Sequence, residues 1–243
     1  MKKKMHLAGF MINSIMNHTV MSWAHPKSRQ GTEFMKPDFW QDIARTLERG
    51  KFDGLFFADL FGVPSVYKNS MEPTIQYGVV FPIHDPLVLI PYLASVTEKL
   101  GFTATMSTNA YHPYVLTRLL LTLDHLTNGR IGWNVVTGHQ RSEYGNLGLN
   151  NPIPHDERYT QAEEYLEVCR KLWNSWEPGA VLIDKEKKIY ADPAKVRPIN
   201  HEGKYYRCVG PSPVLPSPQG HPAIFQAGTS AAGKRFAAKH AEA

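Results

Sequence analysis

The chain has 243 residues, of which 42% are hydrophobic, and its formal net charge is +5. This length is sufficient for one sizeable domain, and the small charge, much of it from Lys2 to Lys4, does not indicate a nucleic-acid surface. The most apolar long window, residues 77–96, contains prolines, a histidine and an aspartate, so no membrane span is predicted. Cys169 and Cys208 lack metal or redox spacing, which favours the cytoplasm as compartment.

Strands and helices alternate in the first part of the chain. We predict strands at 5–12, 52–58, 102–108 and 131–136, each followed by a helix or a long connection. The helices begin at Pro37, at Asp85 and near Tyr114, and Gly50 and Gly129 follow two of them, as glycines do at helix ends. Residues 60–84 form a longer connection than a barrel loop needs, which indicates a lid or a wall over the site.

The second part begins with an amphipathic helix that we expect Asp156 to cap. Residues 175–221 are rich in turns and prolines, and we interpret them as an insertion with short strands at 187–191 and 204–209. A strand at 223–226 and a helix opened by Ser230 complete a fifth strand-helix unit. The predicted fold class is therefore α/β, a (β/α)8 TIM barrel truncated after about five units, with residues 1–243 as a single incomplete domain.

Polar residues gather at the predicted carboxyl ends of the strands, where an α/β barrel places its chemistry. Asp59 ends an apolar strand and needs a partner there, which is either a loop-anchoring cation or a ligand. Thr105, Asn134 and Thr137 either pack or donate hydrogen bonds to a ligand. His139 follows the central strand and is a candidate for proton transfer near neutral pH.

Two helix starts are candidate anion sites, because unpaired backbone N–H groups and the helix dipole favour negative charge there. His155 and Tyr159 flank the first of them, although a solvated histidine and a core tyrosine are the alternatives. Thr229 and Ser230 open the last helix, where plain capping is equally compatible with the sequence. The chain shows no P-loop, dinucleotide fingerprint, zinc motif or GxSxG elbow, so no metal site is predicted.

Several separated motifs resemble the bacterial-luciferase superfamily. They are FFAD at 56–59, DHLTNGRIGWNVVT at 124–137, HDERY at 155–159 and FQAGTSAAGKRFAAKHAEA at 225–243. Within the superfamily, the chain is similar to the branch that contains nitrilotriacetate, dibenzothiophene-sulfone and long-chain alkane monooxygenases. The final AKHAEA resembles the helix that precedes a further strand, in agreement with a truncated barrel.

The resemblance implies a two-component monooxygenase of the luciferase-like type. Such a protein takes reduced FMN from a separate NAD(P)H-dependent flavin reductase and uses O2 to oxygenate a small organic substrate; we also expect a homo-oligomer. A deazaflavin-dependent hydride transferase of the same fold and a non-catalytic partner subunit are the alternatives. The resemblance assigns flavin contacts to Asp59, Thr105, Asn134 and Thr137, phosphate or ribityl contacts to His155 and Tyr159, phosphate contacts to Thr229 and Ser230, and a substrate-specific role to His139.

Overall fold

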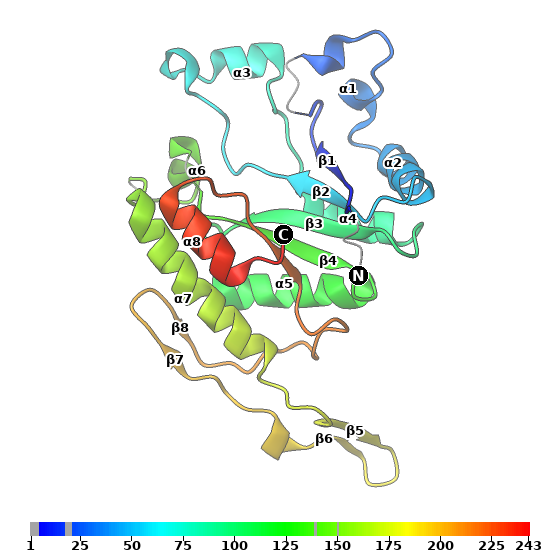
Figure 1. Cartoon of the computed structure of the whole chain (residues 1–243), viewed down its shortest axis with the longest axis vertical. Helices are drawn as coiled ribbons and strands as arrows, with labels where there is room; N and C mark the ends of the chain where they lie inside the picture. Colours follow the sequence, from blue (N-terminus) through cyan, green and yellow to red (C-terminus); the bar gives the residue numbers. More distant parts are fainter. Residues whose placement is uncertain (1–4, 18–20, 139, 150) are drawn as a thin grey trace.

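A parallel sheet of five strands forms the centre of the computed structural model, which describes residues 5–17, 21–138, 140–149 and 151–243 (Figure 1). The strands are β1 (Ala8–Ile12), β2 (Gly54–Ala58), β3 (Gly101–Ser107), β4 (Ile131–Val136) and β9 (Ala223–Phe225), and they lie side by side in this order. Sequential parallel strands with helical crossovers are the arrangement of an α/β barrel, so the predicted five units are confirmed.

The longer helices of the described part of the chain cover the outer face of the sheet or its ends (Figure 1). They are α2 (Pro37–Arg49), α4 (Pro86–Ala94), α5 (Pro113–Leu126), α7 (His155–Trp173) and α8 (Ala231–His240). The connections contain α1 (Gln30–Glu33), α3 (Glu72–Tyr77), α6 (Arg141–Asn146) and three 3-10 helices, at Ser22–Ala24, Tyr67–Asn69 and Pro193–Lys195. The connection at 60–84 is therefore less irregular than predicted, because α3 lies within it.

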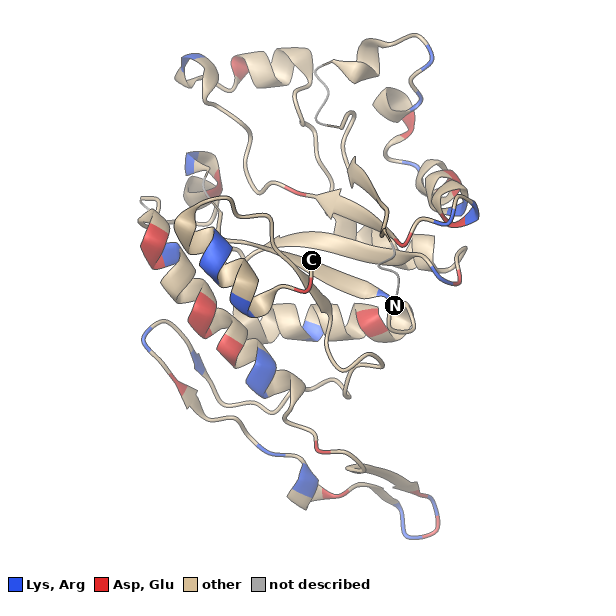
Figure 2. Cartoon of the chain, in the orientation of Figure 1, with Lys and Arg blue, Asp and Glu red and all other residues tan. Residues whose placement is uncertain are grey.

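The two faces of the sheet differ because side chains alternate along each strand. Phe57, Met106 and Trp133 point outward into a core that they share with Trp40 and Leu120 of the helices. The other face carries an aromatic row in which the rings of Phe10 and Phe56 are stacked 5.6 Å apart and Phe225 meets Phe56 edge-on. None of the five strands of this sheet contains a charged residue, as Figure 2 shows, whereas the helices and connections are rich in them.

The turn between α5 and β4 fastens the amino-terminal end of the sheet. The buried carboxylate of Asp124 accepts hydrogen bonds from the backbone N–H of Ile131, the side-chain amide of Gln219 and the Ser217 hydroxyl. Gly129 has a φ of 76°, as expected of the glycine after a helix. Asp124 thus couples the turn to residues almost a hundred positions later in the chain.

The excursion at 175–221 contains two antiparallel hairpins, and the first of them projects away from the sheet (Figure 1). These are β5 (Val181–Asp184) with β6 (Ile189–Ala191), and β7 (His201–Glu202) with β8 (Arg207–Cys208). The predicted strand at 204–209 is wrong in extent, since Glu164 of α7 accepts the backbone N–H groups of Tyr205 and Tyr206 and so draws them out of the ladder. The strand at 187–191 likewise begins only at Ile189, because the preceding lysines form the hairpin turn.

A helix capped by Asp156 would begin at residue 157, whereas α7 begins two residues earlier, at His155. The extended Pro154 precedes it without a side-chain cap, and Asp156 lies inside the first turn, so this prediction is wrong. Cys169 and Cys208 are both buried free thiols. In the described ranges, no helix combines the length and the apolar character that crossing a bilayer requires.

Glu48, at the end of α2, joins this helix to the segment that precedes β3. Its carboxylate accepts the backbone N–H groups of Glu98, Lys99 and Leu100 at 2.9, 2.6 and 3.0 Å. Burial opposes its ionisation, but these three donors outweigh it and lower the pKa of Glu48. We expect Glu48→Gln to lose about 1.5 kcal/mol of unfolding free energy at neutral pH, measured by urea denaturation.

A pKa lowered by folding stabilises the folded state above the unfolded pKa, and this stabilisation disappears as the pH falls through the folded pKa. The difference between Glu48→Gln and the parent chain should therefore vanish in acid. Glu186→Gln, in the exposed turn of the β5–β6 hairpin, is the matched control and should change stability by less than about 0.5 kcal/mol. An equal loss in acid and at neutral pH would contradict the role of the charge.

Candidate functional site

Two adjoining cavities lie at the carboxyl ends of the strands. The first, which we call the strand cavity, has a volume of about 260 Å³, and the second, the helix cavity, about 230 Å³. The strand cavity is lined by Phe10, Phe56, Ala58, Asp59, Leu60, Phe61, Thr105, Ser107, Asn134, Val136, Gly138, Gln140, Glu143 and Ala227. The helix cavity is lined by Val135, Val136, Thr137, Gly138, His155, Arg158, Tyr159, Gln226, Ala227 and Gly228. Because they share Val136, Gly138 and Ala227, the two cavities adjoin, and we call the pair the groove.

Asp59 follows β2 directly and borders the strand cavity. One carboxylate oxygen accepts the backbone N–H of Leu60 at 2.9 Å, and no ion pair joins Asp59 to another described residue. Burial raises its pKa to about 7, and the negative charges of Asp85 and Glu143 add to this effect. The sequence left two interpretations open, a loop-anchoring cation or a ligand. Among the described residues no cation pairs with Asp59, which favours a carboxyl group held for a ligand.

Asn134 and Thr105 are cross-strand neighbours on β4 and β3, and both face the strand cavity. The amide nitrogen of Asn134 donates to the hydroxyl of Thr105 at 2.9 Å, whereas its carbonyl oxygen is buried without a partner. A buried carbonyl oxygen that lacks a donor is costly, so this oxygen is placed to accept an N–H or O–H group from a molecule in the cavity.

The helix cavity lies at the start of α7. His155 and Tyr159 both line it, with their rings 5.2 Å apart, and His155 also pairs with the carboxylate of Asp156 at 2.7 Å. Arg158 of the same first turn contributes a guanidinium whose Nε is buried without a partner. A cation and a helix amino terminus around one small cavity are suited to an anion such as a phosphate.

Gly228 brings the segment after β9 into contact with the start of α8. A Cβ added there would lie 2.9 Å from both the Cα of Gly233 and the hydroxyl of Tyr159, so only glycine fits. Ser230 caps α8 by accepting the backbone N–H of Gly233 at 3.1 Å. Ser230 and its neighbour Thr229 adjoin the helix cavity through Gly228 and are not themselves part of its lining. The capping interpretation of Ser230 is therefore realised in this structure.

A model of the luciferase-like monooxygenase family matches residues 16–243. The chain belongs to this family. It is 48% identical over its whole length to the long-chain alkane monooxygenase of Geobacillus thermodenitrificans and covers 55% of that protein. A crystal structure of long-chain alkane monooxygenase superposes on all of this chain with a TM-score of 0.97, which confirms the luciferase-like TIM-barrel fold; the chain covers 56% of that structure.

A second solved structure to which this chain is similar is that of a riboflavin lyase with modified FMN and the substrate riboflavin. It is 37% identical, with a TM-score of 0.92, and the match covers 99% of this chain and 54% of that structure. The chain thus spans about half the length of the relatives that it matches.

The described residues bring most of the predicted site together. Asp59, Thr105 and Asn134 line the strand cavity, and Thr137, His155 and Tyr159 line the helix cavity. The prediction for His139 concerns a residue outside the described ones.

Five polar residues of the groove were missed by the sequence analysis, namely Ser107, Gln140, Glu143, Arg158 and Gln226. Arg158 lies within the HDERY motif, three residues after His155 and on the same helix face, and this spacing could have indicated it. Gln140 and Glu143 lie in a connection and a short helix, where the sequence carries no periodic signal. The side-chain oxygen of Gln140 is another buried acceptor without a partner.

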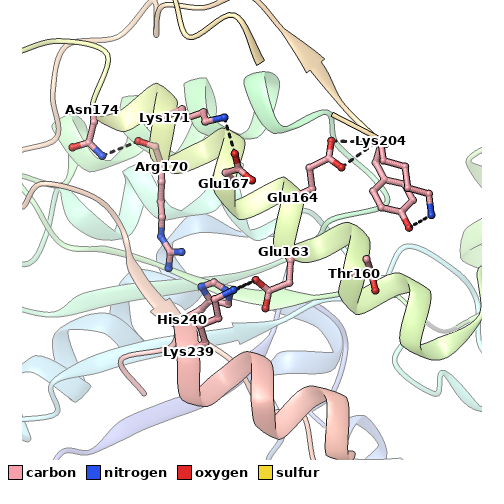
Figure 3. A pocket seen from close by; sticks show the side chains of 11 residues that line it. Thr160, Glu163, Glu164, Glu167, Arg170, Lys171, Asn174, Lys204, Lys239 and His240 are labelled. Carbon is pink, nitrogen blue, oxygen red and sulfur yellow. Dashed lines mark hydrogen bonds and ion pairs between the residues drawn. The ribbon is translucent and has the colours of Figure 1, made fainter. Parts of the chain in front are cut away.

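A larger cleft of about 740 Å³ lies on the outer surface between α7, α8 and the β7–β8 hairpin (Figure 3). Its charged residues largely neutralise one another, since Lys171 pairs with Glu167 at 2.6 Å and His240 with Glu163 at 2.8 Å. The carboxylate of Glu164 accepts the backbone N–H of Tyr206 in the hairpin. These contacts fasten the excursion and α8 to α7, which explains the cleft without a ligand.

Proposed function

We propose that this chain forms the flavin-binding part of an FMN-dependent two-component monooxygenase, which oxygenates a small organic substrate with O2 and reduced FMN. The observation that carries the proposal is the groove, in which the carbonyl oxygen of Asn134 in the strand cavity and the Nε of Arg158 in the helix cavity are both buried without a partner. A flavin ring carries N–H donors and FMN carries a phosphate, so both unpaired groups would gain partners.

In this proposal, Asn134 and Thr105 orient the ring edge, while Arg158, Tyr159 and the start of α7 hold the phosphate. Bound reduced FMN supplies the electrons that activate O2. The apolar residues of the strand cavity exclude water from the reacting groups. A separate NAD(P)H-dependent reductase supplies the reduced cofactor, as in the two-component branch that the sequence resembles.

Arg158→Met tests the phosphate assignment. Loss of a charge-assisted hydrogen bond should lower the affinity for reduced FMN by about thirtyfold, the equivalent of roughly 2 kcal/mol. An anaerobic fluorescence titration measures this affinity. Riboflavin lacks the phosphate, so its affinity should not change. The control is Arg170→Met, an exposed arginine on the same helix, for which both affinities should stay unchanged. Equal losses for FMN and riboflavin would contradict the phosphate role.

The parent chain in the same titration tests the proposal itself. Binding of reduced FMN followed by O2 consumption in the presence of substrate is the expected result. Preference for a deazaflavin coenzyme without O2 consumption would instead indicate a hydride transferase. A folded chain that binds neither coenzyme would contradict the catalytic assignment and favour a partner subunit, and circular dichroism establishes whether the chain is folded.

A further inference from the structure

Glu143 is a buried acid in the wall of the strand cavity. It lies on α6, and only 5% of its surface is exposed. One carboxylate oxygen accepts the hydroxyl of Ser107 at 2.7 Å, which ties it to the end of β3. Gly138 has a φ of 64°, and a Cβ at that position would lie 2.5 Å from the same carboxylate oxygen. The end of β4 is therefore shaped to leave room for this carboxylate.

The backbone around Glu143 is clamped to the connection that follows β2. The hydroxyl of Ser142 donates to the carbonyl of Val63 at 2.9 Å, and the amide of Asn146 donates to the carbonyl of Phe61 at 3.1 Å. Gly62 packs against this helix so closely that a Cβ there would lie 2.7 Å from the backbone nitrogen of Glu143. The position of the carboxylate is thus fixed by packing on both sides.

The electrostatics of the strand cavity come from acids alone. Among its described lining residues, Asp59 and Glu143 are the only ionisable side chains, and most of the others are apolar. Neither acid forms an ion pair within the described part of the chain. The pKa of Asp59 is raised to about 7 by burial and by the charges of Asp85 and Glu143, which shows that the field in this cavity disfavours negative charge.

The cavity has a strand side and a loop side. Thr105 and Asn134 lie on the strand side, where the carbonyl oxygen of Asn134 is buried without a hydrogen-bond donor. Leu60, Phe61 and Glu143 stand on the loop side. With the flavin ring assigned to the strand side, the loop side is left for the substrate.

We propose that Glu143 is a specificity-determining residue that reserves this cavity for uncharged, largely apolar molecules and excludes carboxylates. This deepens the proposed function, because it names the substrate class of the same site. An anion that enters would meet a fixed like charge in surroundings of low polarity, without a described cation to compensate it. An uncharged chain of similar shape would meet only the favourable apolar wall.

Two matched probes test the charge preference, namely 2-heptanone and hexanoate, which differ by a methyl group in place of a carboxylate oxygen. Binding is measured by calorimetry at about pH 8, with and without FMN. We expect 2-heptanone to bind and hexanoate to be at least about tenfold weaker, the size of a like-charge penalty at this range. Glu143→Gln keeps an acceptor for Ser107 and removes the charge, so hexanoate should gain about tenfold while 2-heptanone is unchanged.

Glu167→Gln, at an exposed position of α7, is the control and should leave the ratio of the two affinities as in the parent chain. The proposal is overturned by hexanoate binding as tightly as 2-heptanone, by an unchanged ratio in Glu143→Gln, or by neither probe binding. The FMN titration on the same samples separates the two proposals. A charge preference without FMN binding refutes the flavin assignment alone, and FMN binding without a charge preference refutes only the role of Glu143.

Discussion

Asp59→Asn is expected to make the folded chain more stable at about pH 8, by roughly 2–4 kcal/mol. The pKa of Asp59 rises from 3.8 to about 7 on folding, chiefly through burial. The folded state therefore holds its proton longer than the unfolded state, so stability is lost as the pH rises from about 4 to 7 and stays low above that. Asparagine cannot ionise and still accepts the N–H of Leu60. The midpoint of thermal unfolding should rise by roughly 10 °C at pH 8 and stay unchanged at about pH 3.

Asp38→Asn provides the matched control, since Asp38 is an exposed aspartate in the first turn of α2. It should lower stability by less than about 1 kcal/mol, through the helix dipole. If Asp59→Asn shifted the unfolding midpoint equally at pH 3 and pH 8, ionisation of Asp59 would not be the cause.

Asp59→Asn should also weaken the binding of reduced FMN, because the family resemblance assigns a flavin contact to Asp59. Binding sites often hold a charged group that lowers the stability of the fold, because the group is needed for function. A destabilising carboxylate in a cavity fits this pattern. Greater stability together with weaker flavin binding would distinguish this role from a structural one.

The architecture could be predicted because its signals are local. The apolar run from Ile131 to Val136 and the glycine after α5 determine a strand and a helix end within a few residues. Parallel strands then bring their carboxyl ends to one edge, so Asp59, Thr105 and Asn134 could be expected to lie together before any distance was known.

The parts that were missed depend on contacts between distant segments. The strand predicted at 204–209 is shortened by Glu164, some forty residues earlier, whose carboxylate competes for the backbone N–H groups of the hairpin. The role of Glu143 depends on Ser107 and Gly138, which come from two different strand ends. Neither contact leaves a periodic trace in the sequence, because a single side chain on an irregular segment has no pattern to repeat.

Gly228→Ala should abolish tight FMN binding and destabilise the chain by about 3 kcal/mol, the upper range for overpacking. The new methyl group would meet the Cα of Gly233 and the hydroxyl of Tyr159, both at 2.9 Å, and the Gly233 contact is backbone that cannot rotate away. The start of α8 and Tyr159 must then move apart, and the helix cavity loses its shape. We expect reduced FMN to bind about a hundredfold more weakly, whereas the affinity for riboflavin should fall much less.

Gly145→Ala is the control that isolates this steric effect. Gly145 lies on α6, and a Cβ there would have no neighbour within 4 Å, so alanine should be neutral or slightly stabilising. Urea denaturation and the FMN titration measure both variants under one set of conditions. Should Gly228→Ala bind FMN and riboflavin as the parent does, the close approach of the β9–α8 segment to Tyr159 would not shape the phosphate end of the groove.

Because the clash is with backbone, adding a side chain at Gly233 as well should deepen the defect. A shorter side chain at Gln226, whose flexible amide also lies close, should not relieve it.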